Sequence, residues 1–269
     1  MGWIDFPIIA LLTSVSLIAG SIFSAFPLLN IKIPFNKIYS DILLVIAITV
    51  QGLFIILLWI VLNRPPLKTL GETRLWYSFF LTLIGFITYK RWNYIIILLY
   101  VNSMALLFII LNYTHPENHD KTLMPALQSA WFGPHVIVYM LGYAFLGLSA
   151  IIALIGLYQI YFTSLKVKIL QMADNMAYLG YACVTLGLLF GALWAKEAWG
   201  NYWTWDPKET WALLTWMSYL IYIHFRYRKA NSAKPALWTL ALAFVILLIA
   251  WFGINYLPSA QNSVHVYSN

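Results

Sequence analysis

Long apolar runs separated by short polar segments constrain the fold of this chain more than any other feature of its sequence. Crossing the hydrocarbon core of a bilayer, about 30 Å thick, takes roughly 20 helical residues. Each crossing segment must be a helix, because a backbone exposed to lipid has to satisfy its own hydrogen bonds. The sequence therefore predicts an all-α, polytopic transmembrane helical bundle of about eight spans, at residues 6–29, 40–62, 75–89, 93–113, 134–163, 175–195, 208–226 and 235–256.

The third and fourth predicted spans allow a second interpretation. Lys90, Arg91 and Trp92 form a very tight turn between them, and the third span is short, so the two together could form one bent hairpin. Because no linker or low-complexity tract marks a second folded domain, the chain is expected to form one helical bundle.

The composition excludes a soluble domain. Of the 269 residues, 62% are hydrophobic and only 9% are charged, and the mean hydropathy is +0.78. The basic residues behind the formal net charge of +7 lie between the apolar runs, which indicates a lipid bilayer rather than nucleic acid as the partner. Cys183, the only cysteine, lies inside an apolar run, so this chain alone cannot build a disulfide, a CxxC pair or a zinc knuckle.

The placement of Lys and Arg predicts the orientation of the spans. The loops after the first, third, fifth and seventh spans hold ten of these residues, and the opposite loops hold six. Because basic loops stay in the cytoplasm, both termini are expected on the outer side. The first run lacks a basic leader and a convincing cleavage site, so it is expected to be a retained span. Three segments would then share the outer face: the tryptophan-rich loop between the sixth and seventh spans, the segment 114–134, and the segment 257–269.

Tryptophans are concentrated in one segment, because six of the 13 fall between positions 194 and 216. An aromatic belt at the headgroup level spreads tryptophans over all helix ends, so it explains few of these. Flat indoles at this density are typical of a platform for a large planar apolar ligand, with the indole N–H groups left to meet its polar edges.

The end of this segment predicts a helix start. Asp206 can cap the helix, Pro207 fits the first helical position, and Glu209 follows three residues after the cap, as in a capping box. Asp206 therefore has a structural role available beside direct contact with a ligand, and both interpretations stay open. Gly200 would let the backbone turn tightly or approach a ligand closely.

The stretch Trp199-Gly-Asn-Tyr-Trp-Thr-Trp-Asp-Pro-Lys-Glu-Thr-Trp resembles the WWD signature of haem-handling membrane proteins. The version is that of the CcsA (ResC) family, in the System II pathway of cytochrome c maturation. Similarity continues through Pro125-Ala-Leu-Gln-Ser, His135, Ile221-Tyr-Ile-His224 and the segment from Asn255 to His265, over about the C-terminal 145 residues. The resemblance separates N-terminal spans without a recognised motif, 1–113, from a haem-handling cytochrome c assembly region, 114–269. The haem-contacting residues that it implies in the tryptophan segment are Trp199, Gly200, Trp203, Trp205, Asp206 and Trp211.

Two histidines are candidates for an outer haem site. A haem iron takes neutral imidazole as an axial ligand. His135 stands at the outer start of the fifth span, where the positive end of the helix dipole disfavours the imidazolium form. His265 lies in the tail just past the eighth span, so a two-histidine clamp on one non-covalently held, b-type haem is expected. The resemblance implies the same pair, although many relatives have Gly-Leu-His-Ser-Tyr where this chain has Ser263-Val-His-Val-Tyr.

A third histidine suggests an inner site. His224 stands 17 residues beyond Pro207 on one predicted helix, which places it roughly 25 Å deeper, at the cytoplasmic end of the membrane. An ionisable residue in a span is a functional candidate, although near a helix end it can also complement the last carbonyls. The resemblance implies an inner haem ligand whose partner histidine comes from another subunit. The first four spans contain no histidine, so a separate CcsB (ResB) type membrane subunit is the expected partner.

The remaining two histidines lie in one polar segment. His115 and His119 could form a small metal site with Glu117 or Asp120, but Pro116 and the polar neighbours favour a solvated loop.

The resemblance implies haem export or presentation, and covalent attachment of haem to apocytochrome c on the outer face. The chain would be a subunit of a System II cytochrome c synthase, a haem lyase that acts only with its CcsB/ResB partner. Haem vinyl groups would join the two thiols of a Cys-x-x-Cys-His motif in the apocytochrome, and catalytic residues separate from haem handling are not expected. The expected location is a bacterial cytoplasmic membrane rather than a plastid thylakoid membrane.

Two other classes of protein remain as alternatives. A transmembrane haem-bearing electron-transfer subunit would be favoured by paired histidines within single spans, whereas the histidines here stand on separate segments. A small-molecule transporter would carry ionisable residues near the bilayer midplane and broken helices in two repeats, and the sequence offers neither.

Overall fold

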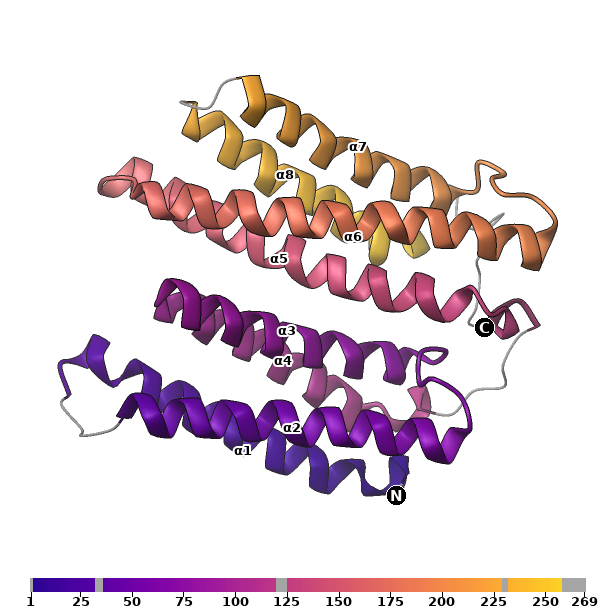
Figure 1. Cartoon of the computed structure of the whole chain (residues 1–269), viewed down its shortest axis with the longest axis horizontal. Coiled ribbons are helices and arrows are strands. Elements are labelled where there is room, and N and C mark those ends of the chain that lie inside the picture. Colours follow the sequence, from indigo (N-terminus) through magenta and orange to yellow (C-terminus); the bar gives the residue numbers. More distant parts are fainter. Residues whose placement is uncertain (1, 32–35, 120–124, 229–231, 258–269) are drawn as a thin grey trace. The chain divides into compact units, whose positions relative to one another are not determined.

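The structure, a computed structural model, describes residues 2–31, 36–119, 125–228 and 232–257. Every regular element in these ranges is a helix, and eight of them are long α-helices (Figure 1). The long helices are α1 (Phe6–Ala25), α2 (Asn36–Leu62), α3 (Leu70–Trp92), α4 (Ile95–Thr114), α5 (Phe132–Phe162), α6 (Val167–Trp199), α7 (Pro207–Arg228) and α8 (Ala233–Trp251). Short 3₁₀ helices are η1 (Trp3–Asp5), η2 (Phe26–Leu29), η3 (Pro116–Asn118), η4 (Pro125–Gln128) and η5 (Gly253–Tyr256).

Six stretches of the described residues are long and apolar enough to cross a membrane, and they contain α1, α2, α4, α5, α6 and α8. The other two long helices, α3 and α7, carry charged residues in both their first and last turns. The polytopic helical bundle predicted from the sequence is confirmed, with α3 and α7 as its less apolar members.

The third and fourth predicted spans are two separate helices. α3 has 23 residues and is longer than the predicted span 75–89. It ends at Asn93, which adopts the left-handed conformation (φ 53°) and donates its backbone N–H to the carbonyl of Tyr89. Asn is one of the few residues that enter this region at low cost, so it allows a turn of two residues before α4 begins.

The helices group into two compact units, Met1–Leu123 with α1 to α4 and Met124–Asn269 with α5 to α8. In the first unit α1 packs against α2 and α4, and α3 packs against the same two helices. In the second unit α5 packs against α6 and α8, and α7 packs against the same two helices. Each unit is thus a four-helix arrangement, and in the second unit α6 also touches α8.

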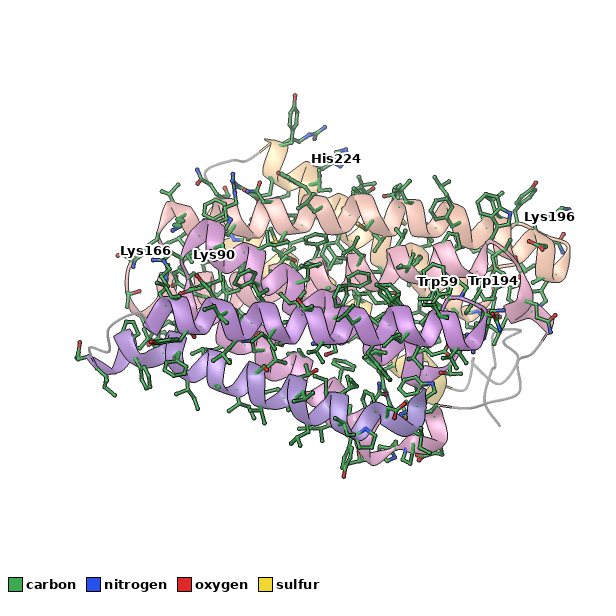
Figure 2. All side chains as sticks on the ribbon, turned by 60° about the horizontal axis from the view of Figure 1, so that its bottom comes forward. Trp59, Lys90, Lys166, Trp194, Lys196 and His224 are labelled. Carbon is green, nitrogen blue, oxygen red and sulfur yellow. The ribbon has the colours of Figure 1, made fainter. Side chains whose placement is uncertain are left out.

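Contacts within the first unit show which segments share an end. The ring of His119, just after η3, stacks on Trp3 of η1, with 3.9 Å between the ring centroids. At the other end Lys90 pairs with Asp41, with 2.6 Å between Nζ and Oδ2. Lys90 and Trp59 lie at opposite ends of this unit (Figure 2). The N-terminus and the segments after α2 and α4 therefore share one end, in agreement with the predicted alternation of the spans.

The solvated loop expected around both His115 and His119 is wrong for His119. His119 is only 9% exposed, because it packs against Trp3 and edge-on against Phe6. Burial lowers the pKa of His119 below the usual value of 6.5, and the charge of Arg74 acts in the same direction. A hydrogen bond to the Asn112 backbone and the charge of Glu117 oppose this shift. His115 is exposed and contacts Glu117 at 2.8 Å, as a solvated loop predicts.

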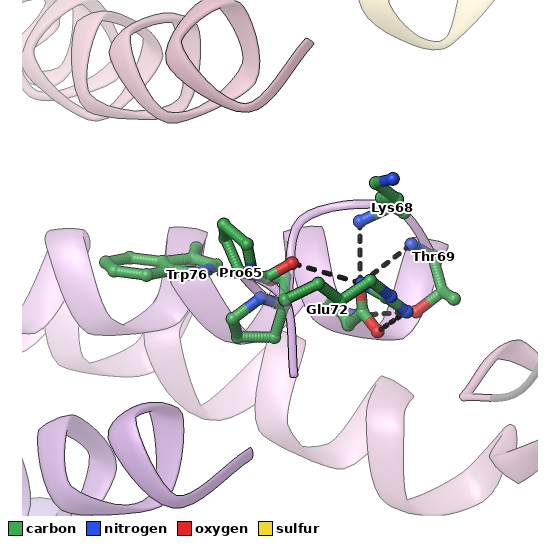
Figure 3. A network of polar contacts seen from close by, with 7 residues as sticks. Pro65, Lys68, Thr69, Glu72 and Trp76 are labelled. Carbon is green, nitrogen blue, oxygen red and sulfur yellow. Dashed lines mark hydrogen bonds and ion pairs between the residues drawn. The ribbon is translucent and has the colours of Figure 1, made fainter. Parts of the chain in front are cut away.

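The turn between α2 and α3 is built around a buried carboxylate (Figure 3). Glu72 is fully buried and accepts hydrogen bonds from both terminal nitrogens of Arg64, at 3.0 and 2.8 Å. It also accepts from the backbone N–H groups of Lys68 and Thr69. Thr69 caps α3 in return, because its hydroxyl accepts from the Glu72 N–H. This capping box therefore bonds the N–H groups of Lys68, Thr69 and Glu72, and Arg64 balances the charge of the carboxylate.

Close packing between α5 and α6 shapes the second unit. A Cβ added at Gly180 would lie 2.5 Å from Leu146, one at Gly187 would lie 2.3 Å from Tyr139, and one at Gly191 would lie 2.8 Å from His135. The three glycines recur at helical spacing, so α6 presents one face without side chains to α5. The side chains of α5, including His135, therefore lie directly against the backbone of α6.

Candidate functional site

The tryptophan-rich segment begins at the end of α6. Trp194 and Trp199 lie in the last two turns, with 4.9 Å between their ring centroids. α6 ends at Gly200, whose left-handed backbone (φ 84°) lets its N–H bond to the carbonyl of Lys196. The expectation that Gly200 provides a tight turn is confirmed, since side chains rarely adopt this conformation.

The loop after Gly200 presents two further indoles. Trp203 and Trp205 meet edge to face, with 5.7 Å between centroids. Trp205 is 68% exposed and has a positive φ of 62°, which for a bulky side chain costs about 1–3 kcal/mol and is found mainly at functional positions. The Nε1–H of Trp203 is buried and has no hydrogen-bond partner in the described part of the chain. The loop therefore holds an exposed indole in a strained backbone, beside a buried donor that a polar group could satisfy.

The predicted start of α7 is confirmed. Asp206 accepts a hydrogen bond from the N–H of Lys208 at 2.9 Å. Glu209 reaches back to the N–H of Asp206 at 3.2 Å and to that of Thr204 at 2.8 Å. Asp206 is buried and acts as the helix cap, so its structural role is established, while a direct ligand contact remains a prediction. Trp211 follows in the second turn of α7.

His135 lies in the first turn of α5, against α6. Its Nδ1 is 2.9 Å from the carbonyl oxygen of Gly187. Because a carbonyl only accepts, Nδ1 must carry the proton, and in the neutral ring the lone pair then belongs to Nε2. The ring also contacts Tyr139 and Trp194, with centroid distances of 4.8 and 5.4 Å. His135 is thus held in one tautomer, at one edge of the tryptophan segment.

Trp194 connects the predicted site residues, although the sequence did not single it out. Its ring contacts both His135 and Trp199, and its indole N–H donates to the carbonyl of Ala126 at 2.7 Å. Nearby, the hydroxyl of Ser129 donates to Glu197 at 2.6 Å. The Pro125–Ser129 motif therefore fastens the segment before α5 to the last turns of α6. The density of tryptophans marked the segment, but only the contacts identify Trp194 as the residue that joins its parts.

His224 lies on the exposed side of α7, and its Nδ1 is 3.0 Å from the carbonyl of Leu220. The opposite side of the helix is fixed to Asp174 of α6. Tyr222 donates its hydroxyl to Oδ1 at 2.6 Å, and Arg226 donates from Nε and Nη2 at 2.8 Å each. Since residues two apart on a helix point in nearly opposite directions, this clamp turns His224 away from α6.

The predicted residues fall into two groups at different ends of the second unit. His135, Trp199, Gly200, Trp203, Trp205, Asp206 and Trp211 lie at or near the end where α6 passes into α7. His224 lies toward the other end of α7, whereas Trp194 and Lys196 lie at the end of α6 (Figure 2). The predicted second outer ligand, His265, lies outside the described residues. A metal site at His115 and His119 was also considered. The described residues contain no group of three or more His, Cys, Asp or Glu side chains able to hold a metal ion, and Asp120 lies outside them.

Comparison with known proteins identifies the family. A family model described as cytochrome C assembly protein matches residues 8–260. A protein named cytochrome c biogenesis protein CcsA from Nicotiana tomentosiformis is 33% identical, with 76% of this chain and 78% of that protein covered. Proteins of the same name from Guillardia theta and Mesostigma viride are 31% and 28% identical, covering 76% and 94% of this chain and 78% and 93% of their own lengths. The chain belongs to the cytochrome c assembly protein family.

Family membership confirms the resemblance drawn from the tryptophan segment and supports a role in cytochrome c maturation. The match also covers most of α1 and all of α2 to α4, where the sequence showed no recognised motif. Together with the apolar helices, it establishes a polytopic membrane protein of cytochrome c biogenesis.

Proposed function

We propose that the chain presents haem for covalent attachment to apocytochrome c, as a subunit of a membrane cytochrome c synthase. The observation that carries the proposal is the setting of His135. Its bond to the Gly187 carbonyl assigns the lone pair to Nε2, and its ring adjoins the Trp194 and Trp199 pair. A neutral imidazole beside clustered indoles suits a ligand that is planar, apolar and centred on a metal.

The residues of the site fit haem in its polar features as well. The buried Nε1–H of Trp203 has no partner among the described residues, and haem carries propionate groups that accept hydrogen bonds. Trp205 exposes its indole beside this donor. A ligand with an apolar face and an acidic edge would satisfy both side chains at once.

In this proposal His135 and His265 hold the iron while the apocytochrome approaches. Each of its two thiols adds across a haem vinyl group: the sulfur bonds to one vinyl carbon and the hydrogen passes to the other. The addition consumes no electrons, so reduced thiols and reduced iron are conditions of the reaction rather than reactants. The histidine of the Cys-x-x-Cys-His motif then replaces one protein ligand and releases the product.

The inner site is part of the same proposal. His224 is exposed on α7 while Tyr222 and Arg226 fix the other side of the helix, so its ring is available to a neighbouring subunit. We assign that neighbour as a CcsB/ResB type membrane protein that supplies the second ligand. Haem would pass from this inner site to the outer site, with the tryptophan loop and both termini on the outer side of the bacterial cytoplasmic membrane.

The test is purification of the chain with and without the CcsB/ResB type partner, followed by absorption spectra of bound haem. His135→Ala and His265→Ala should lose the outer haem. The inner haem should be bound only in the presence of the partner, and His224→Ala should lose it. His115→Ala is the matched control, because His115 is exposed and lies in the first unit. Wild-type haem content and cytochrome maturation in all three site variants would refute the ligand scheme.

A second experiment separates this proposal from a haem-bearing electron carrier. Co-expression with a c-type apocytochrome should yield a cytochrome whose haem survives denaturation and acid extraction, because the thioether bonds are covalent. An electron-transfer subunit would bind haem and leave the apocytochrome unmodified. Reporter fusions at residue 257 and within residues 229–231 test the orientation, since the first should report an outer location and the second a cytoplasmic one.

A further inference from the structure

We infer that Gly187 and Gly191 are positioning residues for His135, and that they select Nε2 as the nitrogen that binds iron. The inference rests on the proposed function, since it assigns how α6 prepares the outer ligand on α5. Neither glycine contacts haem in this assignment. Both act through the histidine ring.

The first part of the arrangement is the carbonyl of Gly187. Its oxygen lies 2.9 Å from Nδ1 of His135. This oxygen also belongs to the hydrogen-bond ladder of α6, but a carbonyl oxygen has two lone pairs and can accept from two donors. A neutral histidine in water prefers the proton on Nε2, so this bond reverses the ordinary preference. Metal-binding histidines are commonly oriented in this way, by a second hydrogen bond from the other ring nitrogen.

The second part is the missing side chain at Gly191. A Cβ there would lie 2.8 Å from Nδ1 and 2.9 Å from Cε1 of His135, closer than real Cβ atoms approach other heavy atoms. The ring has little room to move aside, because Tyr139 and Trp194 pack against it. Tyr139 is held in turn by Gly187, where an added Cβ would lie 2.3 Å from its ring. Glycine at both positions is therefore required for the contact between His135 and the α6 backbone.

A methyl group at position 191 should push the ring off the Gly187 carbonyl. Nδ1 would then lose its acceptor, and the ring would lose both its tautomer and its fixed orientation. Loss of such an outer partner typically lowers metal affinity by about 10–100-fold.

The test begins with the haem-free full chain in detergent micelles, labelled with ¹⁵N-histidine. The His135 signal, assigned by its disappearance in His135→Gln, should show the Nδ1–H tautomer. In Gly191→Ala that tautomer should be lost, and titration with ferrous haem should give an affinity about 10–100-fold weaker. The control is Gly180→Ala, whose Cβ would meet Leu146 at 2.5 Å in the same helix pair and should leave the His135 tautomer and its haem affinity unchanged.

A wild-type His135 in the Nε2–H tautomer would overturn the inference, and so would a Gly191→Ala variant with wild-type tautomer and affinity. If Gly191→Ala does not fold, the wild-type tautomer decides alone. Failure of the proposed function has a different signature: His135→Gln would then bind haem as the wild type does.

Discussion

The clamp on Asp174 should be one of the strongest polar contacts of the second unit. Asp174 receives three hydrogen bonds from Tyr222 and Arg226, and the side chains of Arg226 and Asp174 are only 10% and 14% exposed. Removing one member of a buried pair costs about 3–5 kcal/mol, because the remaining charge stays buried without a partner. Asp174→Ala should therefore lower the thermal midpoint of the detergent-solubilised chain by roughly 6–20 °C, at about 2–4 °C per kcal/mol.

The matched control is Asp41→Ala in the first unit. Its pair with Lys90 is shorter, 2.6 Å against 2.8 Å between Arg226 and Asp174, but the Lys90 and Asp41 side chains are 46% and 23% exposed. An exposed pair contributes about 0–1 kcal/mol. Because the clamp orients α7, Asp174→Ala should also lose the haem assigned to His224 while keeping that assigned to His135. Equal shifts of the thermal midpoint in the two variants, measured by tryptophan fluorescence, would refute the reasoning from burial.

Three further predictions concern other parts of the chain. Glu72→Ala should destabilise the first unit by about 3–5 kcal/mol, because Arg64 loses its buried partner; denaturant unfolding would show it, and a cost no larger than that of Asp41→Ala would contradict it. The pKa of His119 is lowered in the folded chain, so the unfolded chain binds a proton more readily than the folded one. The stability of the first unit should therefore be intact above pH about 6.5, and it should fall as the pH drops from there toward the lowered pKa. Unfolding titrations should show that slope in the wild type and not in His119→Gln, and identical slopes would exclude this residue as the cause. Trp203→Ala combined with Trp205→Ala should abolish covalent cytochrome assembly while the chain stays folded, and unchanged assembly in the co-expression assay would exclude the tryptophan platform.

The features that the sequence predicted correctly are local or periodic. Apolar runs identify helices because each span satisfies its own backbone, whatever its neighbours are. The start of α7 was predicted from Asp206, Pro207 and Glu209 because a capping box involves only four consecutive residues. The turn at Gly200 belongs to the same class, since a left-handed residue at a helix end depends on the local chain alone.

The features that the sequence did not reveal depend on contacts between distant segments. His119 stands among polar neighbours, yet it is buried because η1 brings Trp3 against it from the start of the chain. Trp194 and Gly187 meet His135 from another helix, and no spacing within one segment predicts that contact. The glycines of α6 carried a usable signal, because their helical spacing matches a close helix interface, but it does not say which side chain fills the gap.

We propose above that His135 binds the iron of the haem that is attached to cytochrome c. Its most direct test is His135→Gly, co-expressed with the CcsB/ResB type partner and a c-type apocytochrome, with and without added imidazole. If His135 holds the iron, this variant should make no covalent cytochrome. Added imidazole, which can occupy the vacated ligand position, should restore the haem spectrum and part of the product. Wild-type amounts of covalent cytochrome from His135→Gly without imidazole would contradict it.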